Sequence, residues 1–184
     1  MTAQDILDFW FRQPPANWFR KNAAFDADVR TRFSATIDVA LGGGLRDWDE
    51  QGATGVLARI LVLDQFTRNA LRGTPASFAG DALALADAME LVDSGAHLTL
   101  TPQQRSFVYM PFEHAEDAAM QDKAIALFTA LAADDASFTD SLDYARRHGK
   151  VIARFGRFPH RNAVLGRPST PEETAFLAGP GSRF

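Results

Sequence analysis

Three short motifs in this sequence concentrate the side chains that could bind a ligand or transfer a proton. The first is FGRFPHRNAVLGR, from Phe155 to Arg167, in which arginines, a histidine and an asparagine stand close to two phenylalanines. The second, DQFTRNALRG, begins at Asp64 and repeats the pair Arg-Asn after an apolar run, and the third, YMPFEHAEDAAMQD, begins at Tyr109 and crowds acids around a histidine. Guanidinium and amide groups are donors suited to carboxylates and phosphates, so the first two motifs indicate anion binding.

An anion-binding cavity would form if the first two motifs meet in the folded chain. Phe155 and Phe158 would anchor the first motif, Gly156 permits a left-handed stop of the preceding helix, and Pro159 prevents the helix from resuming. The residues that we expect to bind the anion are Arg68, Asn69, Arg157, His160, Arg161 and Asn162. The acids that would orient these donors are Asp64, Glu113 and Asp117, with His114 beside them. The alternative is that the same arginines and acids form a buried structural network.

The second motif contains a pair of opposite charges one helical turn apart, Asp64 and Arg68. The simplest reading is a surface ion pair worth about 0.3 to 0.5 kcal/mol. However, Asp64 directly follows residues that look buried, and a buried carboxylate needs a partner because an unpaired charge costs several kcal/mol. The arginines of the first motif are candidates for that partner.

The third motif is the candidate for catalysis. His114 and Asp117 are three residues apart, which on one helix face suits a base with its orienting carboxylate or a pair of metal ligands. The alternative is that Pro111 opens or kinks a helix and the acids lie in its first turn, where the helix dipole favours them. We expect no metal and no cofactor, because a transition-metal site usually needs a third ligand.

Composition and charge limit the possible classes of protein. The chain has 184 residues, of which 46% are hydrophobic, and it contains no cysteine, so disulfides and thiolate sites are excluded. A net charge of -4 argues against general nucleic-acid binding. The N-terminus lacks the features of a signal peptide, and no apolar run is long enough for a membrane span. We therefore expect a cytoplasmic protein with no membrane or nucleic-acid partner.

The elements that must position the three motifs all read as helices. Apolar residues recur at helical spacing in four segments, which are Phe25 to Leu41, Val56 to Leu63, Leu85 to Val92 and Phe138 to Phe155. Three Thr-Pro pairs, at Thr74, Thr101 and Thr170, mark helix starts, and the last two are followed by the Gln or Glu of a capping box. No segment alternates with the period of a strand.

The predicted fold class is therefore all-α. Helices joined by short loops pack as antiparallel neighbours, so we expect helical hairpins that stack as a tetratricopeptide-like array or form an irregular bundle. At this length the chain is most simply a single helical domain over residues 1–184, and it buries roughly 70% of the surface of the unfolded chain.

The sequence also resembles a bacterial family of helical proteins of unknown function. The matching motifs are DILDFWF, WFRKNAAFD, LDQFTRN, RGTPASFAGD, YMPFEHAED, RFGRFPHRNAVLGR, STPEE and the terminal FLAGPGSRF. The resemblance implies an all-helical fold related to tetratricopeptide arrays and brings no established activity. Two positions differ from the family pattern, which commonly has proline in the place of Thr67 and serine in the place of Ala115. Ala115 rules out a mechanism that uses a serine hydroxyl beside His114.

The function that we expect from these residues is the binding of a small anionic ligand or an acidic peptide terminus by the Arg, His and Asn side chains of the first two motifs. The alternative is a hydrolase-type enzyme that uses His114 or His160 with Glu113, with or without a metal. A third possibility is a structural scaffold in which all these residues are paired inside the core.

Overall fold

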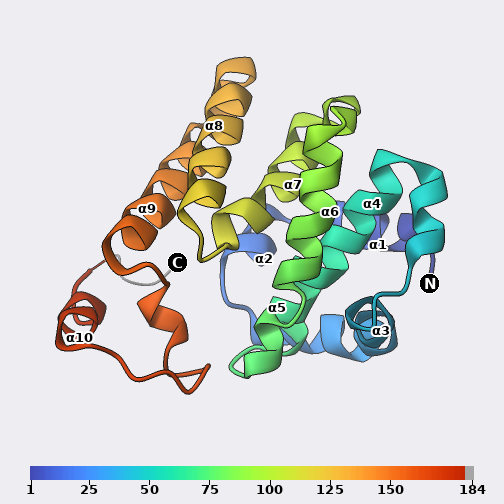
Figure 1. Cartoon of the computed structure of the whole chain (residues 1–184). Helices are drawn as coiled ribbons and strands as arrows, with labels where there is room; N and C mark the ends of the chain where they lie inside the picture. The colour runs from blue at the N-terminus through green and yellow to red at the C-terminus, as the bar shows by residue number, and fades with distance from the viewer. Residues whose placement is uncertain (181–184) are drawn as a thin grey trace. The chain divides into compact units, whose positions relative to one another are not determined.

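The structure is all-helical, as the sequence predicts. It is a computed structural model that describes residues 1–180, and within that range it contains no strand (Figure 1). The last four residues of the motif FLAGPGSRF, 181–184, lie outside the described residues. No helix in the described part of the chain combines the length and the apolar character needed to cross a membrane.

The chain divides into two compact units, Met1–Pro111 and Phe112–Phe184. The first contains α1 (Ala3–Phe11), α2 (Pro15–Phe19), α3 (Ala23–Leu41), η1 (Arg46–Gln51), α4 (Ala53–Ile60), η2 (Leu61–Phe66), α5 (Thr67–Ala70), η3 (Pro75–Phe78), α6 (Asp81–Asp93) and η4 (Ala96–Thr99). The helix α7 (Pro102–His114) crosses the boundary, and the second unit continues with α8 (Ala118–Asp134), η5 (Ala136–Phe138), α9 (Thr139–Phe155), η6 (Pro159–Arg161) and α10 (Pro171–Leu177). A single domain over 1–184 stays a prediction.

The first unit has an aromatic core. Trp10, Phe33, Phe66 and Phe107 are each at most 1% exposed. The ring centroids of Phe33 and Phe66 lie 4.8 Å apart, and those of Trp10 and Phe66 lie 5.5 Å apart. Large aromatic side chains bury much apolar surface per residue, so this cluster holds α1, α3 and the π-helical turn η2 together.

The helix predicted over Val56 to Leu63 is longer than expected. In the structure α4 runs without interruption into η2, a turn of π-helix, and then into α5, which ends at Ala70. The pair Arg68 and Asn69 therefore lies on the same continuous helical stretch as the apolar run. The apolar run did not indicate this, because the buried stretch continues through polar residues such as Asp64 and Gln65.

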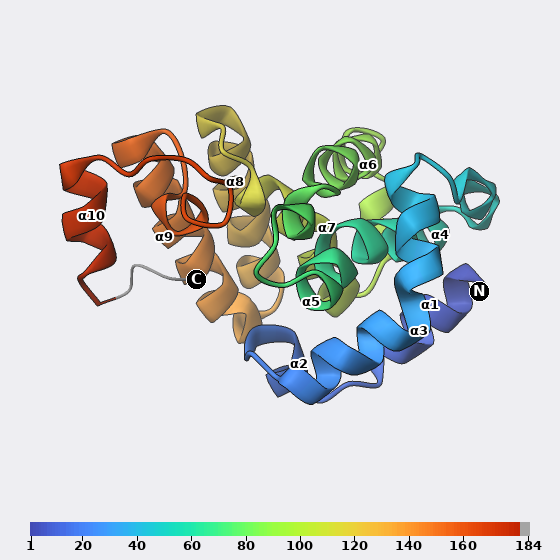
Figure 2. The ribbon, with the colours of Figure 1, turned by 90° about the horizontal axis from the view of Figure 1, so that it is seen from below.

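In the second unit, α8 and α9 form a helical hairpin, and both views of the ribbon show them side by side (Figures 1 and 2). The buried face of α9 carries the predicted stripe, in which Leu142, Ala145, His148, Val151 and Ile152 are buried. The short turn η5 joins the two helices, and a connection of this length makes them antiparallel neighbours.

Two of the three predicted capped helix starts are confirmed in full. Thr170 and Glu173 form a capping box at α10. At α7 the Thr101 hydroxyl accepts from the Gln104 N–H at 3.3 Å, and the Gln104 side chain accepts from the Thr101 N–H at 3.0 Å. Thr74 precedes only the 3-10 turn η3, and its side chain caps no N–H there.

Candidate functional site

The loop that follows α9 is fixed by its backbone, as the first motif predicts. Gly156 has φ 68°, a left-handed conformation that ends α9, and its N–H donates to Ile152 O at 2.7 Å. Phe158 is fully buried against Val151 and Ile152, and Pro159 then opens the turn η6. The side chains of residues 157–167 therefore project from a loop with a defined shape.

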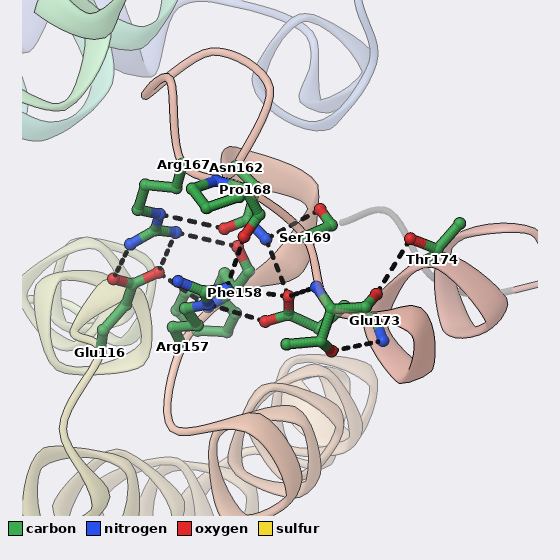
Figure 3. A network of polar contacts seen from close by, with 10 residues as sticks. Glu116, Arg157, Phe158, Asn162, Arg167, Pro168, Ser169, Glu173 and Thr174 are labelled. Atoms are coloured by element: carbon green, nitrogen blue, oxygen red, sulfur yellow. Dashed lines mark hydrogen bonds and ion pairs between the residues drawn. The ribbon is translucent and has the colours of Figure 1, made fainter.

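Two residues of this loop hold a carboxylate from α10. Arg157 donates to both oxygens of Glu173, at 2.7 and 2.9 Å, and the amide of Asn162 donates to the same group at 3.2 Å (Figure 3). We call Arg157 and Asn162 the carboxylate socket. Glu173 is 2% exposed, and its pKa is lowered to about 2, first by the hydrogen bond from Arg157 and then by the Thr170 N–H.

A second arginine of the loop binds a second carboxylate, from the α7–α8 connection. Arg167 donates to both oxygens of Glu116, at 2.6 and 2.9 Å, and the N–H of Phe158 adds a bond of 2.7 Å (Figure 3). Burial raises the pKa of Glu116, but the bonds from Arg167 and Phe158 outweigh burial and lower it. Asn162 joins the two arginine–carboxylate pairs, because its oxygen accepts from Arg167 at 3.0 Å.

The other half of the loop lies in a group that we call the histidine cluster: His114, His148, His160, Arg161 and Phe158. The Phe158 ring is its centre, with the His148 ring centroid at 5.4 Å, the His160 centroid at 5.6 Å and the Arg161 guanidinium 4.6 Å from the Phe158 centroid. His114 stands edge-on to His148, with the ring centroids 6.4 Å apart. Three helical elements, α7, α9 and η6, thus bring three histidines and an arginine together.

The charges of the histidine cluster act on His160. Its pKa is lowered to about 4, first by burial and then by the positive charge of Arg161 and the nearby His148. A lowered histidine pKa of this origin means that a further positive charge is disfavoured at this position. His160 is therefore neutral at pH 7, and its ring provides one donor and one acceptor.

His148, which the sequence analysis did not select, is the observed partner of Glu113. Its Nδ1 lies 3.0 Å from Glu113 Oε1 and 3.0 Å from the carbonyl oxygen of Tyr144. Since a carbonyl oxygen only accepts, Nδ1 carries the hydrogen, and in the neutral ring Nε2 is the basic nitrogen. His148 and Glu113 are 5% and 7% exposed. A histidine on the apolar stripe of α9 was the available signal, because such a residue needs a polar partner.

The third motif is arranged differently from the prediction. Pro111 lies inside α7, which ends at His114, so Glu113 and His114 occupy a last turn and not a first turn. Asp117 is the N-cap of the next helix and accepts from the Met120 N–H at 3.0 Å. The expectation that His114 and Asp117 share one helix face is therefore wrong, since a helix end separates them.

The short connection between α7 and α8 is held by one buried amide. Gln121, 2% exposed, donates from Nε2 to the carbonyl oxygens of Glu113 and Ala115, at 2.7 and 2.8 Å. These bonds satisfy carbonyl groups at the C-terminus of α7, which the helix itself leaves unpaired. Gln121 thus fixes the backbone from which Glu113 and His114 enter the site.

The candidates of the second motif lie in the first unit. Arg68 binds Asp64 at 2.9 Å and also Asp81, at 2.9 and 3.1 Å. Asp64 is 1% exposed, so this is a buried ion pair and not the surface pair that spacing alone suggested. Asn69 donates to Asp26 at 2.8 Å. A joint cavity of Arg68 and Asn69 with the loop of the second unit stays a prediction.

Two of the loop arginines thus bind acids that were not predicted as their partners. Arg157 meets Glu173 and Arg167 meets Glu116, whereas Asp64, Glu113 and Asp117 have the contacts described above. Among residues 1–180, no group of three or more histidine, cysteine or acidic side chains is arranged to hold a metal ion.

Comparisons with known proteins identify the family of this chain. A family model described as "Bacterial protein of unknown function (DUF924)" matches residues 6–181. The solved structure of a protein of unknown function, ATU0120, from Agrobacterium tumefaciens is 42% identical and superposes with a TM-score of 0.86, over 95% of this chain and 96% of that one. No match was found among curated proteins.

Proposed function

The chain belongs to the bacterial DUF924 family, whose function is unknown, and we propose that it binds a small anionic ligand at the histidine cluster. The observation that carries the proposal is the packing of Arg161, His148 and His160 around the Phe158 ring, with His114 edge-on to His148. Guanidinium and imidazole groups are the donors that recognise carboxylates and phosphates. Glu113, an acid next to this cluster, is bonded to His148.

Electrostatics support the same choice. Beyond the effect of burial, Arg161, His148 and His114 lower the pKa of His160 and Glu116 raises it, so the balance of the nearby charges at that ring is positive. A position that disfavours another cation favours an anion, and it does so more strongly where water is partly excluded. In this proposal Arg161 and His160 contact the ligand, and His114 borders it. Arg157 and Asn162 shape the loop through Glu173.

A thermal-shift titration tests the anion site. Phosphate, sulfate and citrate are added to the wild-type protein and to Arg161→Gln, each against sodium chloride of equal ionic strength. We expect at least one anion to raise the midpoint of the wild type and not that of the variant. Arg147→Gln is the matched control, since it removes the same charge from an exposed position on α9. Equal shifts in all three proteins would remove the proposal.

A second candidate function, acid–base catalysis, is favoured by the bond between Glu113 and His148. A carboxylate on Nδ1 orients the ring and leaves Nε2 as the nitrogen that can accept a proton. The pairing of Glu113 with His114 or His160, expected from the sequence, and the catalytic roles of those two histidines stay predictions. Assays on nitrophenyl phosphate and nitrophenyl acetate, with elemental analysis of untagged protein, test this candidate. A rate that Glu113→Gln leaves unchanged would exclude it.

Three finer parts of the expectation also remain proposals. The α8–α9 hairpin supports the view that the chain is built from antiparallel helical hairpins, and their stacking into a tetratricopeptide-like array is proposed by analogy. The cytoplasmic location and the acidic peptide terminus as an alternative ligand remain predictions.

A further inference from the structure

The last helix is attached to its unit in an unusual way. Of the seven residues of α10, Glu173 alone is buried, and its side chain is a carboxylate. Docked helices are ordinarily held by an apolar face, which supplies most of their stability. In α10 the buried contact is instead a charged group bound by the socket residues Arg157 and Asn162.

Three side chains of α10 meet three residues at the end of α9. Glu173 binds Arg157, and Glu172 binds Arg154 through two bonds of 2.9 and 2.8 Å. The ring centroids of Phe176 and Phe155 lie 5.1 Å apart. We call Arg154, Phe155 and Arg157, with Asn162, the docking end of α9. Its charges and its ring match two adjacent acids followed by a phenylalanine three residues later.

The attachment of α10 depends little on fully buried apolar side chains. Phe176 packs against Val151, Ile152 and Phe158 but is only partly buried, Leu177 is also only partly buried, and Glu172 is exposed. Exposed ion pairs contribute little to stability. A buried ion pair gives specificity more reliably than stability. Segments with few buried apolar contacts open at a small fraction of the free energy of global unfolding. When α10 opens, the docking end exposes two arginines and an aromatic ring, which can bind any helix that presents the same side chains.

We infer that α10 is an internal ligand, and that the docking end of α9 also takes a helical segment of a partner protein with the pattern Glu-Glu-x-x-Phe. The spacing is the evidence for a helical peptide, because residues three and four apart share one helix face. A nucleic acid would supply charge without the matched aromatic side chain. The inference goes beyond the proposed anion site and uses neither Arg161 nor His160, the two residues that contact the ligand in that proposal.

A partner peptide must compete with the tethered α10 for the docking end, and the test has to allow for this competition. Residues 162–170 link α10 to the loop, and a short tether holds its ligand at an effective concentration in the mM range. The test therefore weakens α10 in the full chain by Glu172→Gln together with Glu173→Gln. The probe is a fluorescein-labelled peptide with the sequence STPEETAFLA, residues 169–178 of this chain, followed by fluorescence anisotropy at low salt.

We expect the peptide to bind the double variant about tenfold more tightly than the wild type, since the internal competitor is weaker. Binding should fall with added salt, and it should be lost with the control peptide STPQQTAFLA or when Arg157→Gln is added to the variant. Equal affinity for wild type and variant, no binding to the folded variant, or equal binding of the control peptide would each overturn the inference.

Two further measurements keep the test decisive. Circular dichroism shows whether the double variant is folded, and if it is not, Phe176→Ala weakens α10 without changing its charges and is titrated in the same way. Light scattering measures the mass of the variant. If two copies exchange α10 and form a dimer, the ligand of the docking end is a second copy of this chain and not a partner protein, and the inference is refuted. The anion titration with Arg161→Gln is independent, so each proposal can fail alone.

Discussion

At the scale of single residues, Asn162 does the most to organise the loop. Its amide donates to Glu173 and to Ser169, and its oxygen accepts from Arg167. One neutral side chain, 1% exposed, thereby joins two arginine–carboxylate pairs that come from three parts of the chain. Buried hydrogen-bond networks of this kind are costly when one member is lost, because the remaining groups stay buried.

Replacing Asn162 should therefore lower the stability of the folded protein. We expect Asn162→Leu to lower the free energy of unfolding by about 1–3 kcal/mol, since Arg167 and Glu173 each lose a buried bond. Chemical denaturation measures the change. Ser169→Ala is the control, because Ser169 is exposed and its loss removes a single bond of the network. A cost as small as that of Ser169→Ala would show that Asn162 is not the link that we describe.

His160 should make stability depend on mild acid. Its ordinary pKa is 6.5 and its pKa in the folded protein is about 4, so below pH 6.5 the unfolded chain takes up the proton first. The contribution is fully present above pH 6.5 and is lost as the pH falls toward 4. Melting temperatures between pH 7 and 4.5 should fall less in His160→Gln than in the wild type. Parallel curves for the two proteins would contradict the assignment.

The roles of single residues were predicted correctly where the residue type itself restricts the backbone. Gly156 and Pro159 have the backbone roles expected of their residue types. The partners of the arginines were not predictable, because Glu116 and Glu173 lie 51 and 16 residues from Arg167 and Arg157 and no local rule links them. His148 was missed because its spacing on α9 is also that of a core residue.

At the scale of elements, the site depends on where helices begin and end. The left-handed Gly156 turns the chain out of α9, and the capping box at Thr170 starts α10 so that Glu173 faces the socket. The prediction for the third motif was wrong because it misplaced these helix ends. A proline usually marks a helix start or break, whereas α7 accommodates Pro111 one turn before its end. The π-helical turn that extends α4 has no sequence signal that we recognise.

The end of α9 can be tested through its glycine. We expect Gly156→Ala to destabilise the protein by about 1 kcal/mol through backbone strain, since an added Cβ would meet no atom within 4 Å. Gly156→Asn should cost less, because asparagine tolerates the left-handed region. Denaturation of both variants separates conformational strain from packing, and equal costs would contradict this explanation.

The start of α10 should respond to loss of its cap. Thr170→Ala removes the oxygen that accepts from the Glu173 N–H and should weaken the helix by about 1 kcal/mol. Since α10 is held by few contacts, its amide protons should exchange faster while those of α8 and α9 keep their rates. Faster exchange throughout the second unit would show that α10 does not open by itself.

At the scale of the whole molecule, the basic stretch of an acidic chain has a structural explanation. Residues 144–171 contain arginines and a lysine but no acid. Glu172 and Glu173, which directly follow this stretch, and Glu116, which precedes it by 28 residues, bind its arginines in the fold. The all-helical fold was predictable because helical periodicity is repeated along most of the chain. The division into two compact units was not, since it depends on contacts between distant residues.

Acid should loosen these flanking contacts. Glu173 has an ordinary pKa of 4.5 and a pKa of about 2 in the folded protein, so its contribution is present above pH 4.5 and is lost as the pH falls toward 2. The difference in melting temperature between wild type and Glu173→Gln should shrink over this range. A difference that does not change with pH would mean that the carboxylate charge does not hold α10.

The binding of an anion by the histidine cluster is tested most directly by nuclear magnetic resonance of the four imidazole rings during a phosphate titration at constant ionic strength. We predict saturable nitrogen shifts at His160 and His114 in the wild type, and none in Arg161→Gln. His97 serves as the internal reference, because it bonds Tyr109 in the first unit at 2.8 Å. No saturable shift, or the same shifts in the Arg161→Gln variant, would contradict the proposal.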